Sequence, residues 1–215
     1  MLTIWGRRNS FNVQKVMWLA GELGIAHERI DAGGPFGGLD APEFIARNPH
    51  GRVPVIDDDG IVVWESHAIL RYLAARYGAG TFWAEGAAGR AAADQWIEWA
   101  QTALLPNFLN GIFWSYYRTP EAMRNTNAIE RAIAQCAEHV LLLDRQLAGQ
   151  PYICGEKITL ADIPAGTVLF RYYGLDIARP YAPHVEAWYA RLRDRPAYAA
   201  HVMVPFDDLK GRLAF

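Results

Sequence analysis

Cysteine is scarce in this chain, which has two cysteines, Cys136 and Cys154, among 215 residues. Two cysteines do not make the disulfide framework that stabilises small secreted domains. The loop at 6–10 contains neither cysteine nor a Cys-x-x-Cys pair, so a thiol-exchanging cysteine is excluded there. Cys136 occupies an apolar helical position, which favours a core role, and no activating residue lies beside Cys154 in the sequence.

The chain also lacks strong charge and long apolar runs. Its formal net charge is −2, which argues against a nucleic-acid surface. No stretch reaches the apolar length of a membrane span, and the apolar run at the N-terminus is too short for a signal peptide. The glycine-rich loop at 32–38 does not have the spacing of a phosphate-binding loop. We therefore expect a cytoplasmic protein that binds no membrane, nucleic acid or nucleotide.

Apolar and aromatic residues are plentiful. Hydrophobic residues make up 52% of the chain and charged residues 20%, a composition typical of a folded globular protein with one large or two small domains. Eight tryptophans and ten tyrosines are unusually many, and some of them are expected to line an apolar pocket.

The chain is organised around the stretch 48–72. Its pattern predicts a short strand that begins near Pro54, a turn at 57–60 and a second strand at 61–64. Proline cannot donate to a sheet, so Pro54 should lie at a strand start or an edge. A cis bond before Pro54 would turn the chain sharply and expose the backbone amide and carbonyl of Val53.

Secondary-structure patterns divide the chain into two parts. The first eighty residues give the order β-α-β-α-β-β-α, and glycine and alanine interrupt the pattern at 79–89. We expect an α/β domain at 1–78, a linker at 79–89 and an all-helical domain at 90–215.

The helical part shows three further signals. A long helix is expected from Arg90 to Tyr117, and the sequence leaves open whether Pro106 kinks it or divides it in two. A second helix is expected to begin at 119–120 and to run to Leu147. The segment 158–163 has the pattern of a capping box, in which Asp162 reaches back to the N–H of Thr159.

The stretch 48–72 resembles the glutathione-binding half of cytosolic glutathione transferases. The matching pattern is N-P-x-G-x-V-P at 48–54, followed by E-S-x-A-I-x-x-Y-L at 65–73. The resemblance covers essentially the whole chain and implies a thioredoxin-like first domain followed by a helical bundle. It also implies glutathione as co-substrate, no metal, and a homodimer.

Glutathione chemistry requires a thiolate, although the free thiol titrates near pH 8.5. Ser10 and Asn12 lie where the first strand meets the first helix, and each can donate a hydrogen bond to sulfur. Either could instead cap the helix. The segment 6–16 resembles serine-type bacterial transferases of the theta-like or nu-like kind, so both residues are catalytic candidates and the choice between them stays open.

Matching positions imply the contacts of glutathione. The backbone of Val53 would bind the cysteinyl part, and Glu65 and Ser66 would bind the γ-glutamyl ammonium and carboxylate. Arg52, in preference to His50, would bind the glycine carboxylate. The implied glutathione-binding residues are His50, Arg52, Val53, Pro54, Glu65 and Ser66.

A second-substrate pocket is expected against the helix at 105–118. Phe113, Trp114 and Tyr117 cluster there, and Arg118 adds a charge. Clustered aromatic side chains also form cores, and this alternative stays open.

The resemblance implies a glutathione transferase that joins the glutathione sulfur to an apolar electrophile, as in detoxification. Two alternatives use the same site: a glutathione-dependent disulfide-bond reductase or dehalogenase, and a non-catalytic protein that binds glutathione or a hydrophobic ligand. Loss of Ser10 and Asn12 would abolish turnover in an enzyme and leave a binding protein unaffected. The sequence does not identify the natural electrophile.

Overall fold

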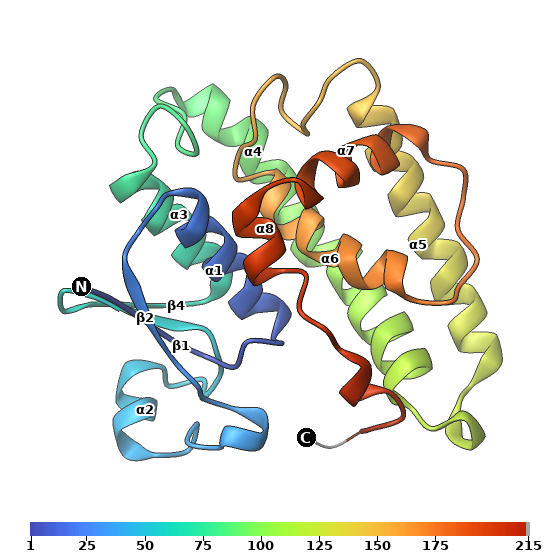
Figure 1. Ribbon diagram of the computed structural model, residues 1–215, viewed down its shortest axis with the longest axis horizontal. Coiled ribbons are helices and arrows are strands. Elements are labelled where there is room, and N and C mark those ends of the chain that lie inside the picture. Colours follow the sequence, from blue (N-terminus) through green and yellow to red (C-terminus); the bar gives the residue numbers. More distant parts are fainter. Residues whose placement is uncertain (214–215) are drawn as a thin grey trace. The chain divides into compact units, whose positions relative to one another are not determined.

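The computed structural model describes residues 1–213 (Figure 1). They form two compact units. The first contains Met1–Trp83 together with Pro196–Val204, and the second contains Ala84–Arg195 and the described residues that follow Val204. Within the described residues, every helix is too short or too polar to cross a lipid bilayer.

The first unit is a small sheet covered by helices, and its order of elements confirms the predicted β-α-β-α-β-β-α. A short 3₁₀ turn at Gly34–Phe36 precedes its second helix. The elements are β1 (Leu2–Trp5), α1 (Phe11–Glu22), β2 (His27–Ile30), α2 (Pro42–Arg47), β3 (Val55–Asp58), β4 (Ile61–Trp64), α3 (Ser66–Tyr77) and, from the distant segment, α8 (Pro196–His201).

The strands form one mixed sheet in the order β2-β1-β3-β4. β1 runs parallel to β2 and antiparallel to β3, which pairs antiparallel with β4. Helices α1 and α3 cover one face of the sheet and α2 covers the other (Figure 1). Ile4 and Ile56 face each other across β1 and β3 and are fully buried, as is Ile69 of α3. This core fixes the ends of α1, β3 and α3 in one place.

The hairpin turn between β3 and β4 is tighter than the sequence predicts. Only Asp59 and Gly60 lie between the strands, and both have positive φ (52° and 89°), as a two-residue hairpin requires. Asp57 and Asp58, predicted as turn residues, belong to β3 instead. Asp58 can be buried in the strand because the hydroxyl of Tyr72 donates to it, at 2.9 Å.

Helix α8 packs against α1 and so belongs to the first unit, although the sequence assigns it to the helical domain. The rings of Trp18 and Tyr198, both fully buried, meet edge to face with centroids 4.8 Å apart. Gln14 donates from its side chain to the carbonyl of Val202. Contacts between residues so far apart in sequence are tertiary, and local patterns do not reveal them.

The second unit is helical, as predicted. Its α-helices are α4 (Ala87–Trp99), α5 (Thr126–Leu147), α6 (Asp162–Gly174) and α7 (Pro183–Arg193). Two π-helical segments, Ala100–Leu104 and Asn107–Arg118, continue from α4, and short 3₁₀ turns lie at Glu121–Met123 and Asp207–Leu209.

The chain stays helical through Pro106, which settles the question that the sequence leaves open. Pro106 has helical dihedral angles (φ −60°, ψ −42°) and lies between the two π-helical segments. Proline lacks the N–H of a regular helix, and its ring crowds the preceding turn. The wider π winding on both sides gives that ring room.

The predicted start of α5 at 119–120 is wrong. The residues after Pro120 form a 3₁₀ turn, and α5 begins at Thr126. The physical reason is a stronger cap further along the chain, because the side chain of Asn125 accepts a hydrogen bond from the N–H of Ala128 at 3.1 Å.

The predicted capping contact of Asp162 is present. Its carboxylate accepts from the N–H of Thr159 at 2.8 Å, from the N–H of Ile153 at 3.0 Å and from the indole N–H of Trp188 at 3.1 Å. Asp162 and Trp188 are both fully buried. One carboxylate therefore joins the loop before α6, the start of α6 and α7.

Candidate functional site

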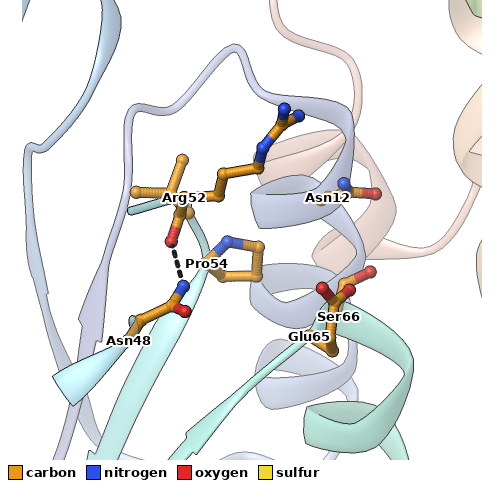
Figure 2. A pocket seen from close by; sticks show the side chains of 7 residues that line it. Asn12, Asn48, Arg52, Pro54, Glu65 and Ser66 are labelled. Atoms are coloured by element: carbon orange, nitrogen blue, oxygen red, sulfur yellow. Dashed lines mark hydrogen bonds between the residues drawn. The ribbon is translucent and has the colours of Figure 1, made fainter. Parts of the chain in front are cut away.

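A cavity in the first unit brings together the ends of α1, β3 and α3. It encloses about 270 Å³ of empty space, part of it open to solvent. Its lining residues come from α1, the loop before β3 and the start of α3 (Figure 2). They are Asn12, Asn48, Arg52, Val53, Pro54, Glu65 and Ser66.

The loop before β3 is held by Asn48, a residue that the sequence analysis did not assign to the site. Asn48 is 2% exposed. Its side-chain nitrogen donates to the carbonyl of Arg52 at 2.7 Å (Figure 2). Its side-chain oxygen accepts from the N–H of His50 at 2.9 Å. Gly51 between them has a φ of +60°, which suits glycine. The only available signal was its place in the 48–54 motif.

The peptide bond between Val53 and Pro54 is cis. Pro54 precedes β3, which begins at Val55, so it lies at a strand start as the sequence predicts. Both residues line the cavity.

The junction between β4 and α3 is strained. Glu65 has φ +67° and ψ 118°, a conformation that residues with a side chain rarely adopt. Such a conformation costs about 1–3 kcal/mol and tends to persist where it serves a site. It places exposed Glu65 beside buried Ser66 at the N-terminus of α3, where free N–H groups attract anions.

Asn12 is connected to a buried polar network. Lys15, one turn further along α1 and 1% exposed, donates from Nζ to Oδ1 of Asn12 at 3.0 Å. The same Nζ lies 3.1 Å from Nε2 of His67 on α3, which is 7% exposed. The sequence analysis missed Lys15 and His67. The spacing of Asn12 and Lys15 along one helix face was the available signal.

Burial shapes the electrostatics of this network. It lowers the pKa of Lys15 to about 7, and the charge of Glu65 opposes this shift. Burial also lowers the pKa of His67 to about 2, and the charges of Lys15 and Arg71 act in the same direction. His67 is therefore neutral, and a neutral imidazole has one ring nitrogen without a proton that can accept from Lys15.

Two of the predicted site residues, Ser10 and His50, are not among those that line the cavity. Ser10 is the N-cap residue of α1, but its side chain makes no capping hydrogen bond. His50 is exposed in the loop before β3. Of Ser10 and Asn12, the two candidate hydrogen-bond donors to sulfur, only Asn12 lines the cavity.

The residues predicted for a second-substrate pocket lie mostly in the interior of the second unit. Phe113, Tyr117 and Arg118 are 2%, 9% and 1% exposed. Phe113 stacks on Tyr117 with centroids 5.5 Å apart, and both rings meet Phe206. This matches the core alternative for these aromatic side chains.

Arg118 is held by two contacts inside the second unit. Its Nε donates to the carbonyl of Arg212 at 2.8 Å. Its guanidinium lies 3.9 Å from the ring centroid of Trp114, a side chain of intermediate exposure. The bond to Arg212 connects the second π-helical segment to the end of the described chain.

A metal site would require several acidic, histidine or cysteine side chains around one point. Between residues 1 and 213, no group of three or more of them is arranged to hold a metal ion.

The chain matches two family models. Residues 1–75 match the glutathione S-transferase N-terminal domain and residues 126–191 match the glutathione S-transferase C-terminal domain. Glutathione S-transferase GstB of Escherichia coli is 37% identical over 95% of this chain and 99% of its own length. Glutathione S-transferase 3 of Zea mays is 30% identical over 92% of this chain and 91% of its own length.

A solved structure gives the same result. The theta class glutathione S-transferase of Xanthomonas axonopodis pv. citri, with glutathione bound, is 45% identical and aligns with a TM-score of 0.89. The alignment covers 95% of this chain and 98% of that one. Together with the cavity formed by the two motif segments, these likenesses show that the chain belongs to the glutathione S-transferase family.

Proposed function

We propose that this protein is a glutathione transferase that binds glutathione in the cavity of the first unit and joins its sulfur to an apolar electrophile. The observation that carries the proposal is the cavity lining, in which Asn12 of α1 meets Val53, Glu65 and Ser66. Asn12 and the Val53 backbone suit the cysteinyl part with its sulfur, the start of α3 suits the γ-glutamyl part, and Arg52 suits the glycyl carboxylate.

The γ-glutamyl end would bind at the start of α3. The carboxylate of Glu65 is suited to the ammonium group, and the Ser66 hydroxyl and the helix N–H groups are suited to the carboxylate. This use explains why the strained conformation of Glu65 is tolerated.

The cysteinyl and glycyl parts would extend along the loop before β3. The backbone of Val53, beside Pro54, would pair with the cysteinyl amide. The glycine carboxylate requires a cation, and exposed Arg52 lines the cavity. His50 lies two residues away and is the second candidate.

The thiolate would be stabilised chiefly by Asn12. A hydrogen bond donated to sulfur favours the ionised form and lowers the thiol pKa from its ordinary value near 8.5. Ser10, at the start of the same helix, would be a secondary donor. The thiolate then attacks the electrophile, a new carbon–sulfur bond forms, and the leaving group departs with its electron pair.

The electrophile and the assembly belong to the same proposal. The electrophile would be a small apolar molecule bound near the segment 113–118, with Trp114 the most accessible residue of that cluster. A homodimer would use edge strand β4, where Ile61, Val62 and Trp64 are 46%, 40% and 39% exposed. We further propose a cytoplasmic enzyme with two functional domains, 1–78 and 90–215, joined by the linker 79–89, in which the 196–204 segment of the second domain completes the first unit.

The test of the assembly is a charge on the proposed interface. Val62→Glu should convert a dimer to a monomer in sedimentation velocity, because a carboxylate in an apolar interface is costly. Tyr181→Glu is the matched control, since Tyr181 is an 83% exposed apolar residue of the second unit. A parent protein that sediments as a monomer would contradict the dimer.

The test of the activity is the pKa of the bound glutathione thiol, followed by thiolate absorbance in the parent, Asn12→Ala and Ser10→Ala proteins. Turnover of a chloroaromatic electrophile is measured in the same samples. The parent should show a lowered thiol pKa, and Asn12→Ala should return it towards about 8.5. Thr81→Ala, which removes a hydroxyl bonded to the carbonyl of Gly78, is the control and should change nothing.

Binding of glutathione with an unshifted thiol pKa and no turnover would overturn the transferase and support a binding protein. Reduction of a disulfide substrate in place of conjugation would support the reductase alternative.

A further inference from the structure

We propose that Lys15 is a positioning residue for the thiolate, because its buried ammonium group holds the side chain of Asn12 with the amide nitrogen turned to the cavity. This proposal rests on the proposed function, since it concerns the group that donates to the glutathione sulfur. It assigns a role to a residue that does not itself line the cavity.

The first step is the chemistry of an asparagine side chain. Its amide has an oxygen that only accepts and a nitrogen that only donates, and the two ends have nearly the same shape. A thiolate accepts hydrogen bonds, so only the nitrogen end stabilises it. A side chain that rotated about its last bond would present the oxygen to the sulfur and repel the anion.

The second step is the partner that decides between these two orientations. An ammonium group has three donors and no acceptor. Nζ of Lys15 lies 3.0 Å from Oδ1 of Asn12, and because an ammonium group only donates, it can hydrogen-bond only the oxygen end of the amide. In Figure 2 the nitrogen of Asn12 lies on the side of Arg52 and Pro54, and its oxygen lies on the far side.

The third step is the support behind Lys15. Nε2 of His67 lies 3.1 Å from Nζ, and both side chains are buried, at 7% and 1% exposure. The network therefore runs from α3 through Lys15 to the cavity wall. The side chains of Lys15 and His67 are already fixed by burial and by their mutual contact, so little conformational freedom remains to be lost when glutathione binds. The orientation of Asn12 is therefore set before binding.

The surroundings of Lys15 explain how the ammonium group is kept in the interior. The charged groups that act on this network are Glu65, the residue before α3, which favours the ammonium form, and Arg71 of α3, which acts on neutral His67. Helix α8 meets α1 at other positions, where Trp18 packs on Tyr198, and Gln14 donates to the carbonyl of Val202 just after α8. A bound thiolate would favour the ammonium form in the same way as Glu65 does.

The experiment is a double-mutant cycle on the thiol pKa. Lys15→Met keeps a long apolar side chain and removes the donor. It should raise the pKa of bound glutathione by about one unit and lower kcat about tenfold at a pH below that pKa, with a smaller change in KM for glutathione. In the Asn12→Ala background the same substitution should cause no further rise, because its effect passes through Asn12.

Gln14→Met is the matched control. Gln14 is 1% exposed, follows α1 residue Val13 and precedes Lys15, and donates to the carbonyl of Val202 just after α8, so its loss disturbs the interior without removing a contact of Asn12. It should lower stability and leave the thiol pKa unchanged. If Lys15→Met does not fold, Lys15→Gln replaces it as the test variant. Glutamine offers Asn12 an acceptor as well as a donor, so the orientation is no longer forced and the thiol pKa should rise.

Three outcomes overturn the proposal. An unchanged thiol pKa in a folded Lys15 variant would show that Lys15 only fills the interior. Equal rises with and without Asn12 would show that its charge acts directly on the thiolate. If the parent itself shows an unshifted thiol pKa and no turnover, the proposed function fails together with this role. A lowered parent pKa that only Asn12→Ala restores leaves the proposed function standing and removes Lys15 alone.

Discussion

Lys15 in the first unit and Asp162 in the second are both charged side chains with almost no exposure, at 1% and 0%. Asp162 is surrounded by donors from three segments of its own unit, and no cavity residue is among them. Lys15 contacts Asn12, a residue of the cavity wall. The difference separates two uses of a buried charge: Asp162 ties segments together, and Lys15 connects the interior to the site.

The two charges also have opposite effects of pH on stability. Burial raises the pKa of Asp162 to about 6, although hydrogen bonds from Ile153, Thr159 and Trp188 oppose the shift. Between about pH 4 and 6 the folded state then keeps a proton that the unfolded state has lost, so this carboxyl lowers stability as pH rises. Lys15, whose pKa is lowered, acts in the other direction at higher pH.

The largest expected effect is the loss of the Asp162 carboxylate. Asp162→Ala should lower the free energy of unfolding by about 3–5 kcal/mol, because it leaves several buried donors without an acceptor. Urea unfolding measures this change. Asp144→Ala is the control, since Asp144 also accepts from two backbone N–H groups, those of His184 and Val185, but is only partly buried.

The control should lose about 1 kcal/mol, as expected for a helix cap. Equal losses in both variants would show that burial does not distinguish Asp162, and the comparison with Lys15 would then lose its basis.

The second effect concerns the strained junction at Glu65. Glu65→Ala and Glu65→Gly both remove the carboxylate, and each should weaken glutathione binding roughly ten- to a hundredfold in calorimetry, the range of a charge-assisted hydrogen bond. Glycine tolerates the positive φ of this position, so the glycine variant should be more stable than the alanine variant by about 1 kcal/mol. Unequal binding by the two variants would show that the backbone conformation, rather than the carboxylate, governs affinity.

The third effect is the pH dependence that Lys15 imparts. The pKa of Lys15 is about 7 in the folded protein and near 10.4 when unfolded. Between these values the unfolded state binds more protons, so stability should rise with pH. The difference in unfolding free energy between parent and Lys15→Met should therefore increase in favour of the parent from about pH 7 to about pH 10. A difference that stays constant across urea titrations at pH 7, 8 and 9 would contradict this assignment.

The smallest effect is expected at the exposed cysteine. Cys154→Ser should change stability by less than about 0.5 kcal/mol and leave turnover unchanged, because the proposed chemistry uses only the glutathione thiol. Cys136→Ser is the buried counterpart and should destabilise the protein by about 1–3 kcal/mol, since it places a hydroxyl in an apolar interior. Loss of turnover in Cys154→Ser would favour thiol exchange by the enzyme.

The family resemblance predicted much of the site. With Asn12, the motif at 48–54 and the pair at 65–66 supplied six of the lining positions, and local patterns predicted the proline and the helix start on which they lie. Asn48 and Lys15 were missed for different reasons. Asn48 was visible in the motif but its role depends on bonds across the loop, whereas the role of Lys15 depends on His67 from another helix.

The sequence by itself determined the order of elements, the hairpin, the helix start at Ser66 and the cap at Asp162, because these follow from residues close together in the chain. Only the tertiary structure decided the rest. It placed α8 on α1, put Phe113 and Tyr117 in the interior and joined Lys15 to the cavity wall. Periodicity shows which face of a helix is apolar. Packing between distant segments decides which partner covers that face and which charged side chain is buried beneath it.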